Sequence, residues 1–389
     1  MRILLSFQQD LTVQPHPVPA YRFWSYYIRQ GIEEAGMHWL EIPGVDWAAG
    51  LVPYEDEPAL GIWKVRAWEL TVKFIKENRA SFDVFLCYLY PKQVDMSAIN
   101  EIKALGVPCV NFYCDNVREF TTPPPEFKVF DLMWVPEFEA LEMYRRAKIN
   151  HIHLPMPMWV APVYRNLPVN ENGKISFIGS KDVLRARLLM EVIESKLDIQ
   201  IRGEGWSPAA EMPISGNLVP HRPKLKNQLR LLAKTGFKGF LIHHLNRVTF
   251  SDKTAIPGEY IFAKPDFEEY ISLTRNSNIV LGINRVPIYR EFGRTSLVYS
   301  RLRDIEAPMI GACYLTEYTP GLKGLYELGK EIETYTNAEE LTAQCREIGS
   351  SASRRMALRK LGQQKALTSL SIPQSLQKIM ERLFKEAGA

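Results

Sequence analysis

No run of about 18 apolar residues, the length that a membrane-spanning helix needs, occurs in the 389-residue sequence. The opening stretch MRILLSFQQD also lacks the long apolar segment and the small-residue cleavage site of a secretory signal peptide. These two absences lead us to expect a soluble protein with a cytoplasmic location.

Cysteine is scarce and follows no metal-binding pattern. No two cysteines have the spacing of a zinc-binding pair, and their number is odd: they stand at positions 87, 109, 114, 313 and 345. Most lie in apolar runs such as VFLCYLY and VPCVNFYC. This predicts buried thiols in a reducing compartment.

Neither sign of charge is in large excess. The net charge is +4 and the hydrophobic content is 46%, as in ordinary folded proteins, so the composition gives no reason to expect a nucleic acid partner. At roughly 100–200 residues per domain, a chain of 389 residues predicts two domains.

The first 160 residues alternate between short apolar runs and amphipathic segments. We expect helices over residues 21–35 and 137–146, and strands at 2–7, 82–90, 107–114, 131–135 and 151–155. Strands that alternate with helices at this spacing predict a doubly wound parallel sheet.

A segment rich in proline and asparagine, residues 156–173, separates this pattern from a second one. A helix is expected over 182–195 with Asp182 as its N-cap, and strands at 174–180, 198–203, 277–285, 312–316 and 331–335. The sequence thus predicts an α/β protein with two Rossmann-like, doubly wound domains, 1–160 and 173–370, that face a cleft. The amphipathic segment 373–389 is expected to pack back on the first domain.

Ligands of open α/β sheets bind outside the carboxyl ends of the strands, so the loops after strands are the places to look for function. The stretch RLRDIEAPMIGACYLTEYTPGL, residues 301–322, lies in such a place. A helix over 300–309 would leave the first-turn amides of Ser300, Arg301 and Leu302 without intrahelical acceptors and available to a phosphate. Arg301 and Arg303 add positive charge, and Glu306 could accept hydrogen bonds from ribose hydroxyls. The alternative is a solvated helix with surface ion pairs.

The segment from Arg301 to Leu341, with RLRDIEAP, YLTE, GKEI and AEEL in order, resembles the C-terminal part of CgeB-like glycosyltransferases of the GT-B fold. VNFYCDN and the residues after it resemble the first domain of that family. The resemblance implies transfer of a sugar from a nucleotide diphosphate sugar, with uridine as the guessed nucleoside. It implies no metal, since arginines and helix amides can balance the phosphate charge.

The resemblance also implies which residues contact the donor. They are Glu306 at the ribose, Ser300, Arg301, Arg303 and Arg294 at the diphosphate, Thr316, Glu317 and Tyr318 at the sugar or phosphates, and Gly179 and Ser180 at the turn after strand 174–180. For that turn, an ordinary connection between strand and helix is the alternative reading.

Three positions depart from patterns of related glycosyltransferases. Val298 stands where a Glu-x7-Glu pair has its first acid, Tyr299-Ser300-Arg301 replaces a Gly-Phe-Gly turn, and Asp115-Asn116 replaces an Asp-Asp turn. These departures leave the manner of phosphate binding and the stereochemical outcome open.

Candidates for a general base follow strands of the first domain. Asp115 follows strand 107–114 and is our first choice; Asp10 follows strand 2–7 and is the second, with His16 nearby. The alternative for each is a role in capping or loop structure.

Histidine pairs and a basic segment complete the candidates. His151 and His153 lie on one strand face with no third metal ligand, and the adjacent His243 and His244 would point apart on a strand, so we expect no metal site. Residues 222–247 contain many Lys and Arg and no acid, which fits either peripheral contact with an anionic membrane or the solvated face of a helix.

The sequence therefore favours a GT-B glycosyltransferase that uses a nucleotide sugar donor and a hydroxyl-bearing glycan, lipid or small-molecule acceptor. Two alternatives stay open at this point. One is a sugar-nucleotide epimerase of the same fold, and the other is a non-catalytic two-domain protein that binds a ligand.

Overall fold

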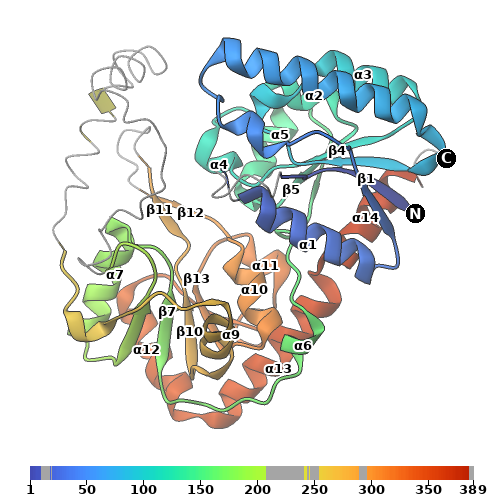
Figure 1. Cartoon of the computed structure of the whole chain (residues 1–389). Helices are drawn as coiled ribbons and strands as arrows, with labels where there is room; N and C mark the ends of the chain where they lie inside the picture. Colours follow the sequence, from blue (N-terminus) through green and yellow to red (C-terminus); the bar gives the residue numbers. More distant parts are fainter. Residues whose placement is uncertain are drawn as a thin grey trace. The chain divides into compact units, whose positions relative to one another are not determined.

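A computed structural model describes residues 1–9, 18, 20–206, 241–242, 245, 254–288 and 296–384. The chain divides into two compact units (Figure 1). Unit 1 consists of Met1–Val160 and Leu367–Ala389, and unit 2 consists of Ala161–Ala366. Each unit is built around its own six-stranded sheet.

The sheet of unit 1 has the strand order β2-β1-β3-β4-β5-β6, and all neighbouring strands are parallel. Its strands are β1 (Arg2–Ser6), β2 (His38–Glu41), β3 (Val84–Cys87), β4 (Cys109–Phe112), β5 (Leu132–Val135) and β6 (His151–His153). The three central strands β3, β4 and β5 are buried along their whole length, as expected for a parallel sheet covered on both faces.

The helices of unit 1 are α1 (Ala20–Glu34), α2 (Glu57–Glu77), α3 (Met96–Ala104), α4 (Asn116–Glu119), α5 (Leu141–Arg146) and α14 (Ile372–Phe384). Sequence analysis did not predict α2, although its N-cap Asp56, which accepts a hydrogen bond from the Ala59 amide, is a helix-start signal. The segment is amphipathic only in part, because Ile62 and Val65 are exposed among its apolar residues.

Helix α14 lies against α1 within unit 1. The backbone of Gly31 on α1 approaches the side chain of Ile372 so closely that a Cβ at Gly31 would lie 2.3 Å from the Ile372 Cγ2 atom. Only glycine permits this approach. The final helix thus belongs to the core of unit 1, although unit 2 separates it from the rest of that unit in sequence.

The sheet of unit 2 is also entirely parallel, in the order β14-β13-β10-β7-β8-β9. Its strands are β7 (Ile175–Ile178), β8 (Ile199–Arg202), β9 (Ile261–Phe262), β10 (Ile279–Gly282), β13 (Tyr314–Glu317) and β14 (Glu333–Tyr335). Because the strand order reverses between β7 and β10, their carboxyl ends form a topological switch point, where ligands of such sheets bind.

In unit 2 the structure describes in full the helices α6 (Pro162–Arg165), α7 (Val183–Glu194), α9 (Phe267–Asn276), α10 (Arg303–Ile310), α11 (Leu322–Leu325), α12 (Ala338–Ser350) and α13 (Ala352–Ser369), the last of which continues into the first residues of the second segment of unit 1. Helix α7 begins after Asp182, whose carboxylate accepts hydrogen bonds from the amides of Leu184 and Arg185; this confirms the predicted N-cap. Apolar side chains of α7 and α12 pack on β7, β8 and β10 and form the core of unit 2.

The strand predicted over 277–285 is wrong in its second half. Strand β10 ends at Gly282, and β11 (Arg285–Pro287) pairs antiparallel with β12 (Ser296–Val298) in a separate two-stranded sheet. At Gly282 a Cβ would lie 2.2 Å from the Tyr314 hydroxyl, so the strand interior requires glycine there. The Asn284 side chain then donates to the Glu317 carbonyl (2.9 Å) and fixes the turn out of the parallel sheet.

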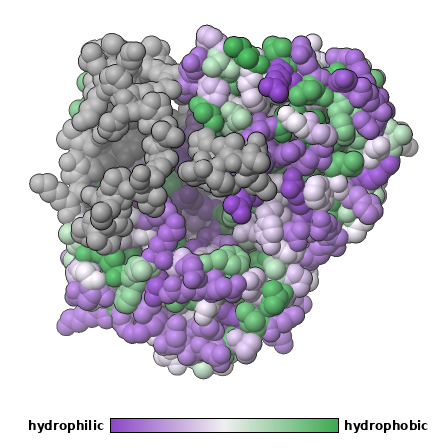
Figure 2. All heavy atoms as spheres, in the orientation of Figure 1, coloured by the Kyte–Doolittle hydropathy of each residue, from purple (hydrophilic) through white to green (hydrophobic). Residues whose placement is uncertain are grey.

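In the face drawn in Figure 2, hydrophilic side chains predominate and hydrophobic ones form small patches. Of the helices that the structure describes, none combines the length and the apolar character that crossing a membrane requires.

Candidate functional site

A pocket of about 360 Å³ opens at the carboxyl ends of β7 and β8 in unit 2. It is lined by the turns 178–180 and 203–204, the loop 264–267, Tyr270 on α9 and Arg303 on α10. The predicted residues Gly179, Ser180 and Arg303 therefore meet at one site, beside the switch point of the sheet.

Two strand ends approach each other closely at the floor of this pocket. Gly203 has a φ of +135°, and a Cβ there would lie 2.2 Å from the Gly179 carbonyl oxygen. The Gly179 amide donates to the Arg202 carbonyl (2.9 Å), and the indole of Trp206 donates to the Gly179 carbonyl (2.7 Å). The turn after β7 is thus fixed by backbone contacts that no side chain at position 203 would allow.

Arg303 connects the pocket to the predicted ribose acid. Its Nη2 atom donates to the Ile178 carbonyl (2.9 Å) and its Nη1 atom donates to the Tyr270 hydroxyl (2.7 Å). That hydroxyl in turn donates to Glu306. Burial acts to lower the pKa of Arg303, but the neighbouring Tyr270 and Glu306 raise it above its usual value. The guanidinium is therefore charged and oriented at the pocket wall.

Sequence reasoning missed two residues of this site. Arg185 on α7 donates to the backbone oxygen of Ser180 (2.8 Å) and pairs with Asp182 (3.1 Å). Its pKa is lowered, first by burial and then by the positive charges of Arg301 and Arg303, while Asp182 opposes the shift. Arg185, Arg301 and Arg303 thus lie close enough to one another near the end of β7 to interact electrostatically. The position of Arg185, three residues after the helix N-cap, was a signal that could have been used.

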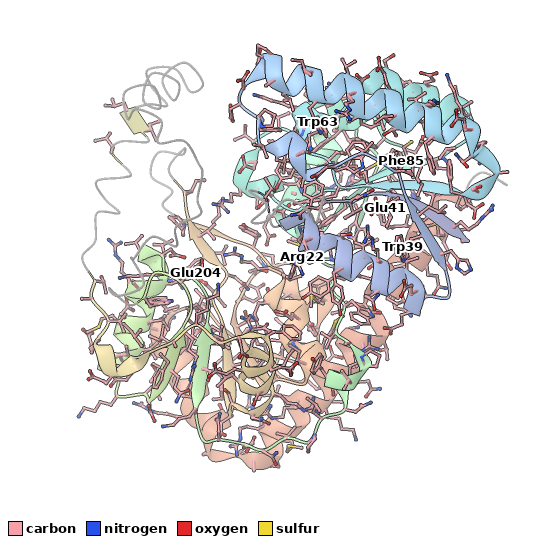
Figure 3. All side chains as sticks on the ribbon, in the orientation of Figure 1. Arg22, Trp39, Glu41, Trp63, Phe85 and Glu204 are labelled. Carbon is pink, nitrogen blue, oxygen red and sulfur yellow. The ribbon has the colours of Figure 1, made fainter. Side chains whose placement is uncertain are left out.

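The second missed residue is Tyr270, which reaches the pocket from α9. Nothing in its local sequence, FEEYISLT, distinguishes it from an ordinary helix residue. Near it, Glu204 lies on the loop after β8 (Figure 3) and forms an ion pair with Lys264 at the pocket edge. Phe267, which also lines the pocket, is 56% exposed.

The predicted helix start at residue 300 is wrong: α10 begins at Arg303. The reason is Asp304, whose carboxylate folds back and accepts hydrogen bonds from the Arg301 amide (2.9 Å) and the Ser300 hydroxyl (3.0 Å). The Arg301 amide therefore already has an acceptor inside the protein. The Arg301 side chain lies over the Tyr299 ring.

Asp304 is fully buried beneath the site and joins α10 to the sheet. Besides the two donors from residues 300 and 301, it accepts hydrogen bonds from the hydroxyls of Tyr314 (2.9 Å) and Thr316 (2.8 Å). Burial raises the pKa of Asp304, and these four hydrogen bonds oppose the shift. Because Pro308 has no amide hydrogen for the Asp304 carbonyl, the hydroxyl of Tyr326 donates to it instead (2.8 Å).

Other predicted donor contacts have partners within unit 2. The Thr316 hydroxyl donates to Asp304. Glu317, which is 4% exposed, accepts hydrogen bonds from the amides of Asn284 and Arg285 and forms an ion pair with the Arg285 guanidinium (2.7 Å). Thr316 and Glu317 both belong to strand β13 rather than to a loop after it. Tyr318 follows the strand and lies below the Lys323 ammonium group. Arg294 lies outside the described residues.

In unit 1, Asp115 directly precedes α4 and does not cap that helix with its side chain. The next residue, Asn116, is fully buried. The second candidate base, Asp10, lies outside the described residues, as do His16, His243 and His244 and most of the basic segment 222–247.

His151 and His153 contact backbone carbonyls, those of Ile149 (2.8 Å) and Val135 (3.0 Å). Burial lowers the pKa of His153. Among the described residues, no three His, Cys, Asp or Glu side chains are grouped as a metal site would require.

Comparisons with known proteins agree with this architecture. A family model described as glycosyl transferase-like matches residues 239–381. No curated protein matches the chain in sequence. Solved structures, in contrast, match over nearly the whole chain.

Sucrose-phosphate synthase from Thermosynechococcus elongatus is 13% identical, covers 99% of this chain and 99% of its own, and has a TM-score of 0.53. A glycosyltransferase from Rickettsia africae is 12% identical, covers 99% and 98%, and has a TM-score of 0.55. Anabaena HepE in complex with UDP is 11% identical, covers 98% and 99%, and has a TM-score of 0.54. The chain therefore has the GT-B fold of two Rossmann-like units, and its residues 239–381 resemble the glycosyl transferase-like family.

Proposed function

We propose that the protein transfers a sugar from a nucleotide diphosphate sugar to a hydroxyl group of an acceptor. The observation that carries this proposal is the pocket in unit 2, where the Gly179-Ser180 turn, Arg303 and, through Tyr270, Glu306 come together. The glycosyl transferase-like match over residues 239–381 supports it. The similar fold of HepE, which was crystallised with UDP and with UDP-glucose, supports a uridine nucleotide donor.

In the proposed complex, the nucleoside lies in the pocket and the diphosphate lies toward the three arginines. Arg303, Arg301 and Arg185 carry the positive charge that a leaving diphosphate needs, so the reaction uses no metal ion. Glu306 accepts hydrogen bonds from the ribose hydroxyls. These compete with the hydrogen bond that the Tyr270 hydroxyl donates to Glu306 in the structure. Ser300, Thr316 and Glu317 act indirectly, because they position Asp304 and Arg285.

The transfer step forms a bond between the acceptor oxygen and the anomeric carbon of the sugar. The bond from that carbon to the diphosphate oxygen breaks, and the nucleotide diphosphate leaves with the electron pair. The proton of the acceptor hydroxyl passes to the carboxylate of Asp115 in unit 1, which acts as the general base.

A panel of nucleotide sugars, incubated with the purified full chain and a mixture of hydroxyl-bearing acceptors, tests the function. Transfer releases free nucleotide diphosphate and a glycosylated product. A change of the sugar without release of nucleotide would instead identify an epimerase. Stabilisation by nucleotide without any chemistry would identify a binding protein.

Glu306→Ala is expected to weaken UDP binding about tenfold, since a carboxylate hydrogen bond to the ribose is lost. Isothermal titration calorimetry with UDP measures this affinity. Glu339→Ala removes an exposed carboxylate on α12 that does not line the pocket, and it should leave the affinity unchanged. Equal affinities in wild type and in a folded Glu306→Ala variant would remove Glu306 from the ribose site.

Asp115→Asn is expected to leave UDP affinity unchanged and to slow transfer about a hundredfold, because the amide cannot take the acceptor proton. Initial rates of product formation measure the effect. The matched control is Asp95→Asn, which makes the same change at another N-cap position of unit 1, where asparagine caps equally well. If Asp115→Asn transfers at the full rate, another group such as Asp10 must serve as the base.

A further inference from the structure

A fully buried polar cluster lies where β4 and β5 of unit 1 end. Its members are Asn116, Glu137 and Tyr144, each with no exposed surface. Strands β4 and β5 are parallel neighbours, so the chain leaves both of them at the same edge of the sheet. Asp115, the proposed base, is adjacent in sequence to one member of this cluster.

Asn116 is the centre of the cluster. The Glu137 Oε2 atom accepts hydrogen bonds from the Asn116 amide (2.9 Å) and from its side-chain Nδ2 atom (2.6 Å). The same Nδ2 atom donates to the Tyr113 carbonyl (2.9 Å), and the Asn116 Oδ1 atom accepts from the Tyr144 hydroxyl (2.7 Å). The turn that carries Asp115 is thus tied to the ends of two strands and to α5.

The carboxyl group of Glu137 is only partly satisfied: Asn116 donates to its Oε2 atom, and the backbone of Val117 also acts on the carboxyl group. Its Oε1 atom is buried without a hydrogen-bond partner, and in the described part of the chain no lysine, arginine or histidine forms an ion pair with this residue. A buried carboxylate without a counter-charge is costly, so such a group binds a proton. A neutral Glu137 accepts the Asn116 hydrogen bonds at Oε2 and carries its proton on Oε1.

The titratable groups around Glu137 reinforce this state. Asp115 and Cys114 at the end of β4 interact electrostatically with it, as does Tyr144 on α5, and His151 on β6 lies against the Tyr144 ring. Burial, with Asp115 as a smaller contribution, raises the pKa of Glu137 to about 8, while the hydrogen bonds from Asn116 and the backbone of Val117 act to lower it.

We infer that Glu137 is a positioning residue for the proposed transfer reaction, which in its neutral form fixes the Asp115-Asn116 turn through Asn116. This role rests on the proposed function and on Asp115 as its base. A neutral carboxyl positions the turn without placing a second negative charge beside Asp115. Ionisation strengthens the hydrogen bonds from Asn116 but leaves a buried charge beside Asp115 without a counter-charge, and movement of the turn toward water relieves that cost.

Two variants separate the position of the turn from the charge. In Glu137→Gln, the side-chain carbonyl accepts the same two hydrogen bonds and the amide nitrogen replaces the protonated oxygen, so the variant mimics neutral glutamic acid at every pH. In Glu137→Ala, both Asn116 donors lose their acceptor. Glu142→Gln, an exposed residue of α5 that pairs with Arg145 and Arg146, is the matched control.

The experiment measures the transfer rate at saturating donor from pH 6 to about 9, together with UDP affinity. We expect the wild-type rate at pH 9 to be about tenfold below that at pH 7. Nearly all Glu137 is neutral at pH 7, whereas only about a tenth is neutral one pH unit above its pKa. Glu137→Gln should transfer within threefold of wild type at pH 7 and lack this alkaline decrease. Glu137→Ala should transfer at least tenfold more slowly at pH 7 with UDP affinity unchanged.

Unfolding provides a second readout that does not depend on activity. A folded-state pKa raised from 4.5 to about 8 means that the contribution of Glu137 to stability is complete below the lower value and is lost as the pH rises through the higher one. The wild-type melting temperature should therefore decrease between these pH values more than that of Glu137→Gln. Glu142→Gln should follow the wild type.

The outcomes separate the two proposals. If the wild type transfers sugar and Glu137→Gln shows the same alkaline decrease, or if both Glu137 variants keep wild-type rates, the positioning role is refuted while the function stands. If the wild type transfers nothing from any donor, the proposed function fails, and this role fails with it.

Discussion

Replacing Asp304 with alanine is expected to lower the free energy of unfolding by about 3 to 5 kcal/mol. Four buried donors would lose their acceptor at once: the hydroxyls of Ser300, Tyr314 and Thr316 and the amide of Arg301. Each buried donor left without a partner costs about 1 to 3 kcal/mol, and relaxation recovers part of the sum.

Urea-induced unfolding of the full chain, followed by circular dichroism, measures this loss, with the slope m compared between variants. Asp304→Asn should cost less, because its Oδ1 atom still accepts from Tyr314 and Thr316 while its amide meets the Arg301 amide unfavourably. Asp198→Ala removes an exposed acid that pairs with Lys174 and should stay within about 0.5 kcal/mol of wild type. A loss below about 1 kcal/mol in Asp304→Ala would show that the network contributes little.

Arg303→Gln is expected to weaken UDP binding about a hundredfold. The substitution removes the charged group nearest the proposed diphosphate, and it also removes the donor that orients the Tyr270 hydroxyl beside Glu306. A charge-assisted hydrogen bond in such a partly desolvated site contributes about 1.5 to 3 kcal/mol, which corresponds to a factor of roughly 10 to 100 in affinity.

Comparison of two ligands makes this test specific. Titration with UDP and with uridine should show that Arg303→Gln loses most of the extra affinity that the diphosphate provides, while uridine binding, which depends on Arg303 only through Tyr270 and Glu306, falls much less. Arg346→Gln, an exposed arginine whose side chain contacts the Ser195 carbonyl, is the control for the loss of one positive charge. Binding of UDP within threefold of wild type would place the diphosphate away from Arg303.

Strand positions were predictable because their signal is local. The run KISFIGS contains both the buried strand β7 and the turn at Gly179 that opens the pocket, and Asp182 marks the start of the helix that follows. The two Rossmann-like units followed from repetition of that pattern. The comparison structures confirm the resulting GT-B fold.

Long-range side-chain contacts were not predictable in the same way. Spacing alone suggested a helix start at residue 300. In the structure, Asp304 accepts a hydrogen bond from the Arg301 amide through one carboxylate oxygen. The other oxygen is held by the hydroxyls of Tyr314 and Thr316, ten and twelve residues later in the sequence. Tyr270 joins Arg303 to Glu306 across more than thirty residues of sequence. Such partners become visible only when the sheet brings distant strands together.

Unit 1 is built from two separate segments of the chain, and this has a consequence for the synthesis of the protein. Helix α1 presents Gly31 to Ile372 of α14, and the whole of unit 2 is translated between them. A nascent chain on the ribosome therefore exposes this face of α1 until α14 has been translated, and only then can unit 1 close. Fragments that end near residue 160 or residue 366 lack α14, so this face of α1 stays uncovered in them. Separate expression of unit 1 therefore requires α14 to be joined covalently to residues 1–160, for example by a circular permutation.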